Sequence, residues 1–147
     1  MRASLVIAAT VIVLAGSASA ENLIPYQDPA AVIEGALLYA DNCAACHGAN
    51  LEGEADWQVT KDNGMRAAPP HDETGHTWHH ADALLFDLTK RGVAEVVGTG
   101  YESDMIGYGD ILSDQEILAT LAYIKSTWPR EVVAQHNEIN LRAGLSP

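Results

Sequence analysis

Apolar residues recur at helical spacing along much of this chain, and the first clear case follows Asp28 and Pro29. These two residues suit the N-cap and the first position of a helix. Apolar and small residues then recur on one face as far as about Asp41. They are Val32, Gly35, Ala36, Leu38 and Tyr39. The pattern therefore predicts a helix over about 29–41.

Two later segments have the same periodicity. One covers about 79–91, and Gly92 is placed to end it. The other begins with a capping box, in which Ser113 caps the first turn and Glu116 reaches back, and it ends before Pro129. The apolar residues are Ala83, Leu84, Phe86 and Leu88 in the first segment, and Ile117, Leu118, Leu121, Ile124 and Trp128 in the second.

The segments between these helices are rich in glycine, asparagine and aspartate and predict irregular loops over 48–68 and 98–109. One more short helix is predicted around 132–140. The sequence has no strand-like alternation, no internal repeat and no linker. The predicted fold class is therefore all-α.

The first twenty residues have the pattern of an export signal. A short charged start, Met1-Arg2, precedes the apolar run 5–14, and the small residues 18–20 form a cleavage site. The apolar run is too short to span a bilayer comfortably, although an uncleaved anchor is the alternative. We expect cleavage after Ala20, no stable membrane insertion and a periplasmic location. The expected mature chain is one domain over 21–147, with a core of about 29–128 and a tail of 129–147.

The chain is strongly acidic, with 8 Lys and Arg against 20 Asp and Glu and a formal net charge of −12. Removal of 1–20, which contains Arg2 and no acidic residue, changes this charge to −13. Such a surface repels nucleic acid and anionic lipid. It favours a protein partner with a basic docking face.

The segment Cys43-Ala44-Ala45-Cys46-His47 has the spacing of a c-type haem attachment site. The two thiols would form thioethers with the haem vinyl groups, and His47 would place a ring nitrogen on the iron. A thioredoxin-like motif should follow a strand, and a zinc site needs more ligands. The chain has no other cysteine and no strand pattern before Cys43, which favours one covalent haem c.

The iron would have one further axial position, for which the chain offers three methionines. Met1 leaves with the signal, and Met65 lies in the first loop. Met105 lies 58 residues after His47, in the glycine-rich loop before the last strong helix. That loop has to cross the far face of the haem if the last strong helix packs on the first. We therefore expect Met105 to be the second ligand, with Met65 as the lesser candidate.

The order of these features resembles class I (mitochondrial-type) cytochrome c of the soluble bacterial kind, over about residues 29–128. The matching features are Gly35 to Tyr39, the haem motif followed by Gly48, Pro69 and Pro70, Met105, and Leu121-Ala-Tyr-Ile-Lys125. The resemblance implies three to five helices wrapped around one covalently bound haem. It also implies that the first and last helices cross near-perpendicularly, with Gly35 and Tyr39 against Tyr123.

The resemblance further implies that a proline carbonyl accepts a hydrogen bond from the free nitrogen of His47. Pro69 is the candidate for this role, and Pro70 is the alternative. The chain departs from the family pattern at two positions. Ile106 stands where relatives often have proline, and His71 stands where a hydrophobic residue often follows the prolines.

Residues 71–80 contain four of the six histidines. A surface copper or zinc site built from some of His71, His76, His79 and His80 is one hypothesis. Displacement of Met105 by one of these histidines is another. We favour a polar loop near the haem propionates, to which Trp78 or a histidine would donate a hydrogen bond, because loop histidines are usually solvated or satisfied locally.

Together these features predict a soluble, monomeric electron carrier rather than an enzyme. Its partners would be redox proteins that donate and accept single electrons. The alternatives are a haem subunit of a periplasmic oxidoreductase and a small gas-binding or peroxidase-like haem protein. The gas-binding and peroxidase-like alternatives need an open or displaceable sixth position on the iron.

Overall fold

The computed structural model describes residues 23–144, so the predicted export signal lies outside the described residues. Within this range the chain forms six α-helices and one 3₁₀ turn, and its only β structure is an isolated bridge between Thr60 and Arg66. The helices are α1 (Pro29–Asn42), α2 (Ala44–His47), η1 (Thr77–His79), α3 (Asp82–Arg91), α4 (Val93–Val97), α5 (Asp114–Ser126) and α6 (Arg130–Arg142). The all-α prediction is confirmed.

The expected number of three to five helices is too low. The two helices that were not predicted, α2 and α4, have four and five residues. Helices this short do not complete two turns, so they leave no periodic pattern in the sequence. None of the helices within 23–144 is long and apolar enough to cross a membrane.

The helices that were predicted begin and end close to the expected residues. Asp28 caps α1 by accepting a hydrogen bond from Ala30 N–H at 2.9 Å. Ser113 and Glu116 form the predicted capping box of α5. Gly92 ends α3 with a positive φ of 88°, as a glycine at this position allows. The start of α3 is later than expected, because the chain first makes the η1 turn.

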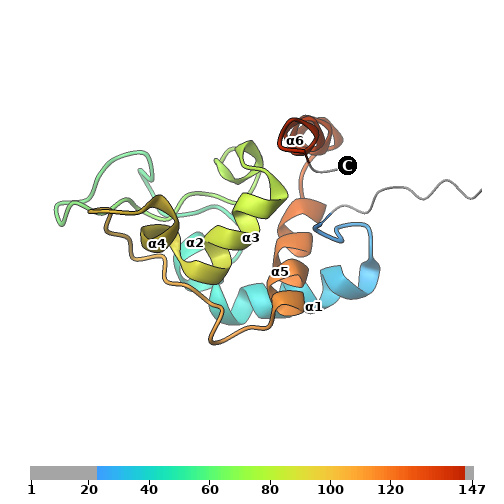
Figure 1. Ribbon diagram of the computed structural model, residues 1–147, viewed down its shortest axis with the longest axis horizontal. Helices are drawn as coiled ribbons and strands as arrows, with labels where there is room; N and C mark the ends of the chain where they lie inside the picture. Colours follow the sequence, from blue (N-terminus) through green and yellow to red (C-terminus); the bar gives the residue numbers. More distant parts are fainter. Residues whose placement is uncertain (1–22, 145–147) are drawn as a thin grey trace, which may run out of the picture.

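Helices α1 and α5 form the main packing interface, and Figure 1 shows α5 standing across α1. Gly35 is buried at the crossing, where a side-chain Cβ would overlap the carbonyl oxygen of Ala119. Tyr39 packs on Tyr123 with 5.4 Å between ring centroids. The crossing implied by the family resemblance is therefore present, with Gly35 against the backbone of α5 rather than against Tyr123 itself.

A single apolar core lies around this crossing. Its buried members are Ile24, Tyr39, Leu51, Leu85, Leu112, Ile117, Leu121, Ala122, Ile124 and Trp128. They come from α1, α3, α5, the segments between these helices, and the residues just before α1 and just after α5.

The tail forms a longer helix than the predicted 132–140, and this helix, α6, packs against η1 at the end of α5 (Figure 1). Its buried residues are polar. His136 Nε2–H donates to the carbonyl oxygen of His80 at 2.8 Å, and Asn140 Oδ1 accepts from Asp82 N–H at 2.8 Å. The helix is therefore attached by hydrogen bonds to the segment that leads from η1 into α3.

Asp82 is the centre of a buried polar cluster. Its carboxylate lies 3.4 Å from Lys125 Nζ and 3.3 Å from His136 Nε2, and it accepts a hydrogen bond from Ile24 N–H at 3.2 Å. All four residues are at most 1% exposed. The cluster thus joins α3, α5, α6 and the segment before α1.

Candidate haem-binding site

The two cysteines lie on a single helical turn at the junction of α1 and α2. Cys43 ends α1 by donating its N–H to Tyr39 at 2.8 Å, and its own carbonyl accepts from His47 N–H at 2.9 Å. Both cysteines are free, with Cys43 half-buried and Cys46 exposed. This turn presents both sulfurs and the His47 ring from five consecutive residues.

The environment of Cys43 differs from that of a redox-active Cys-x-x-Cys pair. Burial, followed by the neighbouring Cys46, raises the pKa of the Cys43 thiol to about 11. Redox-active pairs depend on a lowered thiol pKa and a reactive thiolate. The site therefore argues against the thioredoxin-like alternative and suits thiols that are consumed once by covalent attachment.

His47 is buried, with 7% of its surface exposed, and its Nδ1 lies 2.8 Å from the carbonyl oxygen of Pro69. A carbonyl oxygen only accepts, so Nδ1 bears the proton and Nε2 keeps its lone pair. Burial is the main cause of a lowered pKa for His47, which favours the neutral ring. A neutral imidazole with a free Nε2 and a fixed Nδ1–H is the form that binds iron.

Met105 lies half-buried in the segment between α4 and α5. Its N–H donates to Ser103 Oγ at 3.1 Å, and its carbonyl accepts from Val93 N–H at 3.3 Å. Three residues later, the Tyr108 hydroxyl donates to the carbonyl of Asn42 at 2.8 Å. This bond ties the Met105 segment to the end of α1, directly before the haem motif.

The departure at Ile106 is accommodated by the next residue. Gly107 lies against the end of α3, where a Cβ would come within 2.6 Å of the carbonyl carbon of Arg91. The N–H groups of Tyr108 and Gly109 donate to the carbonyls of Thr89 and Lys90, each at 2.9 Å, and these bonds hold the turn after Met105 without a proline. The ligand roles of Met105 and Met65 stay predictions, and Met65 lies in the other loop, where its carbonyl accepts from Lys61 N–H at 2.8 Å.

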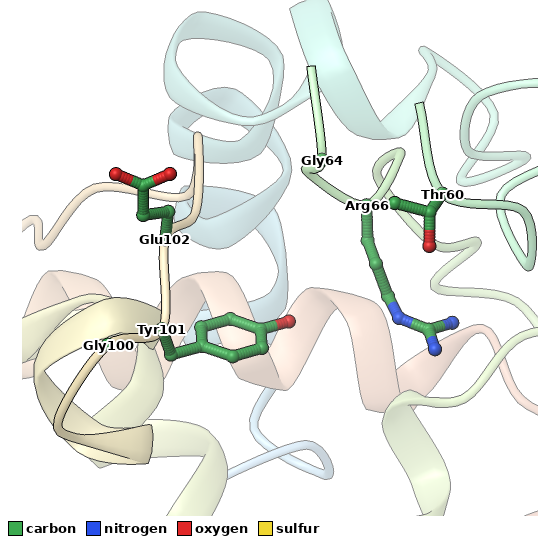
Figure 2. A pocket seen from close by; sticks show the side chains of 6 residues that line it. All are labelled: Thr60, Gly64, Arg66, Gly100, Tyr101 and Glu102. Atoms are coloured by element: carbon green, nitrogen blue, oxygen red, sulfur yellow. The ribbon is translucent and has the colours of Figure 1, made fainter. Parts of the chain in front are cut away.

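One ion pair of Lys61 connects the two loops. Lys61 Nζ lies 3.1 Å from Glu54 in its own loop and 3.8 Å from Asp104 in the Met105 segment. A cavity of about 210 Å³ is lined by residues of the same two loops, Thr60, Gly64, Arg66, Gly100, Tyr101 and Glu102. Figure 2 shows the Tyr101 ring pointing toward the loop that bears Arg66, while the Glu102 carboxylate turns away. The facing parts of the two loops are therefore polar and include two of the chain's eight basic residues, Lys61 and Arg66.

The histidines of 71–80 divide into two groups. His71 stacks on His47, with 3.9 Å between ring centroids and 21° between planes. His76, His79 and His80 cluster near the surface instead, where His80 Nε2 lies 3.2 Å from His76 Nδ1. Trp78 Nε1–H donates to the carbonyl of Glu73 at 3.2 Å.

The surface-metal hypothesis finds no support in this arrangement. Across residues 23–144, no three side chains among His, Cys, Asp and Glu are placed to hold a metal ion. Sequence reasoning missed the inward position of His71. The sequence contained one indication of this position, since His71 stands two residues after Pro69, where relatives often have a hydrophobic residue.

The donor groups present fit a covalently bound haem. They comprise two free thiols on one turn, a neutral imidazole with one nitrogen fixed by Pro69, and a thioether in a well-held loop. The soft thioether and the imidazole are the ligand types that haem iron accepts in electron-transfer sites.

Comparison with known proteins gives the same assignment. The family model described as Cytochrome c matches residues 32–128. A curated relative, the Cbb3-type cytochrome c oxidase subunit FixP of Azorhizobium caulinodans, is 27% identical over 93 residues. The match covers 63% of this chain but 28% of the relative, so the chain spans less than a third of that protein's length. No solved structure gives a significant match.

Proposed function

The chain belongs to the cytochrome c family, and from this premise we propose that it is a periplasmic electron carrier with one haem c. In this proposal Cys43 and Cys46 hold the haem, while His47 and Met105 ligate the iron. Haem, when bound, supplies reversible one-electron chemistry. The protein binds and orients it and offers a docking face to redox partners.

The observation that best supports this proposal is the hydrogen bond from His47 Nδ1 to the Pro69 carbonyl. It fixes the ring tautomer and leaves Nε2 for the iron in both oxidation states. The Met105 segment is held by Val93, Ser103 and Tyr108. Because hydrogen bonds hold both ligand segments, we expect electron transfer to need little structural reorganisation.

The experiment that tests the ligand assignment compares Met105→Ala with Met65→Ala in the exported, haem-loaded protein. We expect a low-spin spectrum with the weak red thioether-to-iron band in the wild type and in Met65→Ala. Met105→Ala should lose that band and show a lower reduction potential, because a thioether ligand raises the potential. A band that survives in Met105→Ala, or disappears in Met65→Ala, refutes the assignment.

The proposed location and domain boundaries have a direct test. Intact-mass analysis of the exported protein should give a chain that begins at Glu21 and bears one haem. A mass that still includes 1–20 supports the anchored alternative. A mass without haem contradicts the cofactor proposal.

The acidic surface predicts the salt dependence of partner binding. With a net charge of −13 after signal removal, electron transfer to a basic redox protein should slow as ionic strength rises from about 0.01 to 0.15 M, because screening shortens the range of attraction. Stopped-flow kinetics measures this rate. A rate that is indifferent to salt contradicts a basic docking face on the partner.

A second candidate function follows from the curated relative, which is named as a subunit of an oxidase. In this alternative, the chain acts as a haem subunit within an oxidoreductase complex. Size-exclusion chromatography of native extract separates the two proposals. Haem absorbance that elutes with a small protein supports the free carrier, while elution with a large assembly supports the subunit.

A further inference from the structure

His71 is held firmly against the predicted proximal ligand by its backbone. Its N–H donates to the carbonyl of Leu51 at 2.8 Å, and its own carbonyl accepts from Trp128 Nε1–H at 2.7 Å. Trp128 is a buried member of the core at the end of α5. The position of the His71 ring is therefore set by the core rather than by a mobile loop.

The His71 side chain is oriented as well as placed. Its Nδ1 lies 2.6 Å from the hydroxyl of Thr77, which is buried and lies 3.5 Å from the carbonyl oxygen of Pro70. The hydroxyl can donate to a bare Nδ1 or accept from an Nδ1–H, so the two groups are joined by a hydrogen bond in either tautomer. This bond fixes the rotation of the ring, and its flat face meets the His47 ring at 3.9 Å.

The hydrogen bond to Pro69 restrains one atom of His47 and leaves the plane of the ring less well determined. A flat, hydrogen-bonded neighbour stacked at 21° removes this freedom. An aliphatic side chain, which the family often has here, would fill the space without favouring one ring angle. The stack thus adds an orientation that packing alone does not supply.

We propose that His71, oriented by Thr77, is a positioning residue that sets the plane of the His47 imidazole. This inference rests on the proposed role of His47 as the iron ligand. The ring plane determines the direction in which the imidazole π orbitals overlap with the iron. His71 therefore governs the electronic asymmetry of the site without touching the iron.

The test uses Thr77→Val, which removes the hydrogen bond to His71, and Thr77→Ser, which keeps it. His71→Leu removes the flat face that meets His47. The readouts on the oxidised, haem-loaded protein are the electron paramagnetic resonance g values and the spread of the shifted haem-methyl NMR signals. Circular dichroism checks folding.

We expect Thr77→Val and His71→Leu to shift the g values and the methyl spread while the iron stays low-spin. Thr77→Ser should match the wild type. Wild-type signals in Thr77→Val overturn the inference, and so does a shift in Thr77→Ser as large as that in Thr77→Val. If His71→Leu fails to fold, the two Thr77 variants decide alone. A wild-type protein without low-spin haem would instead refute the proposed six-coordinate ligation of the iron by His47 and Met105.

Discussion

Replacement of Gly35 by alanine tests whether the α1–α5 crossing depends on close approach of the two backbones. A Cβ at residue 35 would lie 2.5 Å from the carbonyl carbon of Ala119 and 3.0 Å from the amide nitrogen of Thr120. Carbon atoms prefer separations of about 3.5–4.0 Å. The helices must therefore separate by about 1 Å, because the atoms that collide are backbone atoms that cannot rotate away.

Two opposing effects determine the size of the change. Alanine in a helix interior is favoured over glycine by about 1 kcal/mol. Overpacking of a tight contact costs about 1–3 kcal/mol and occasionally more. Here the separation also weakens the contact between Tyr39 and Tyr123 and the core around it. We therefore place the overpacking cost at about 3 kcal/mol. After the gain of about 1 kcal/mol, we expect the free energy of unfolding to fall by about 2 kcal/mol, which corresponds to a decrease of about 8 °C in Tm for a domain of this size.

The assay is thermal and guanidinium unfolding of the haem-loaded protein, followed by circular dichroism and by haem absorbance. Glu34→Ala is the control, since Glu34 is the exposed neighbour of Gly35 on the same helix. It should change Tm little. A Gly35→Ala protein that melts at or above the wild-type temperature would refute the requirement for glycine at this crossing.

Two further predictions concern the buried polar cluster. Asp82→Asn leaves the buried Lys125 ammonium without its counter-charge, so the free energy of unfolding measured with denaturant should fall by about 3–5 kcal/mol. The double variant Asp82→Asn/Lys125→Met should recover part of this loss, because the unpaired buried charge is then removed. A double variant less stable than Asp82→Asn would contradict this. For the pH dependence, burial and then the charge of Lys125 lower the pKa of His136 from 6.5, against the opposing effect of Asp82. The unfolded chain therefore binds more protons below about pH 6.5, and the free energy of unfolding should fall as the pH drops through this window. Denaturant melts at several pH values should show a shallower fall for His136→Gln, and equal slopes would exclude this contribution.

The sequence predicts the helices whose apolar periodicity and caps are strong. The starts of α1 and α5 follow from Asp28 and Ser113, and the end of α3 follows from Gly92. The short α2 and α4 leave no periodic signal. The extent of α6 is hidden for a different reason, since its buried residues, His136 and Asn140, are polar and resemble those of an exposed face.

The sequence predicts the residues of the candidate site that are adjacent in the chain, but it does not predict the contacts between residues far apart in the chain. Cys43, Cys46 and His47 are adjacent in the sequence, so their spacing alone indicates their chemistry. The stack of His71 on His47 depends on the path of a 24-residue segment and on contacts with Trp128, at the far end of α5. No pattern of neighbouring residues specifies such a contact.

The attachment of α6 changes how the folding unit should be defined. The region that matches the family ends at residue 128, before α6 begins. Yet the His80 carbonyl and the Asp82 N–H find their buried partners on that helix, and Ile24, on the other side of the match, donates to Asp82. A fragment cut at the family boundaries would lack these partners and would leave polar groups in its interior without hydrogen bonds. We therefore expect the cooperative unit to extend from about 24 to 140, so that the family boundaries should be a poor guide to where this domain tolerates truncation or fusion.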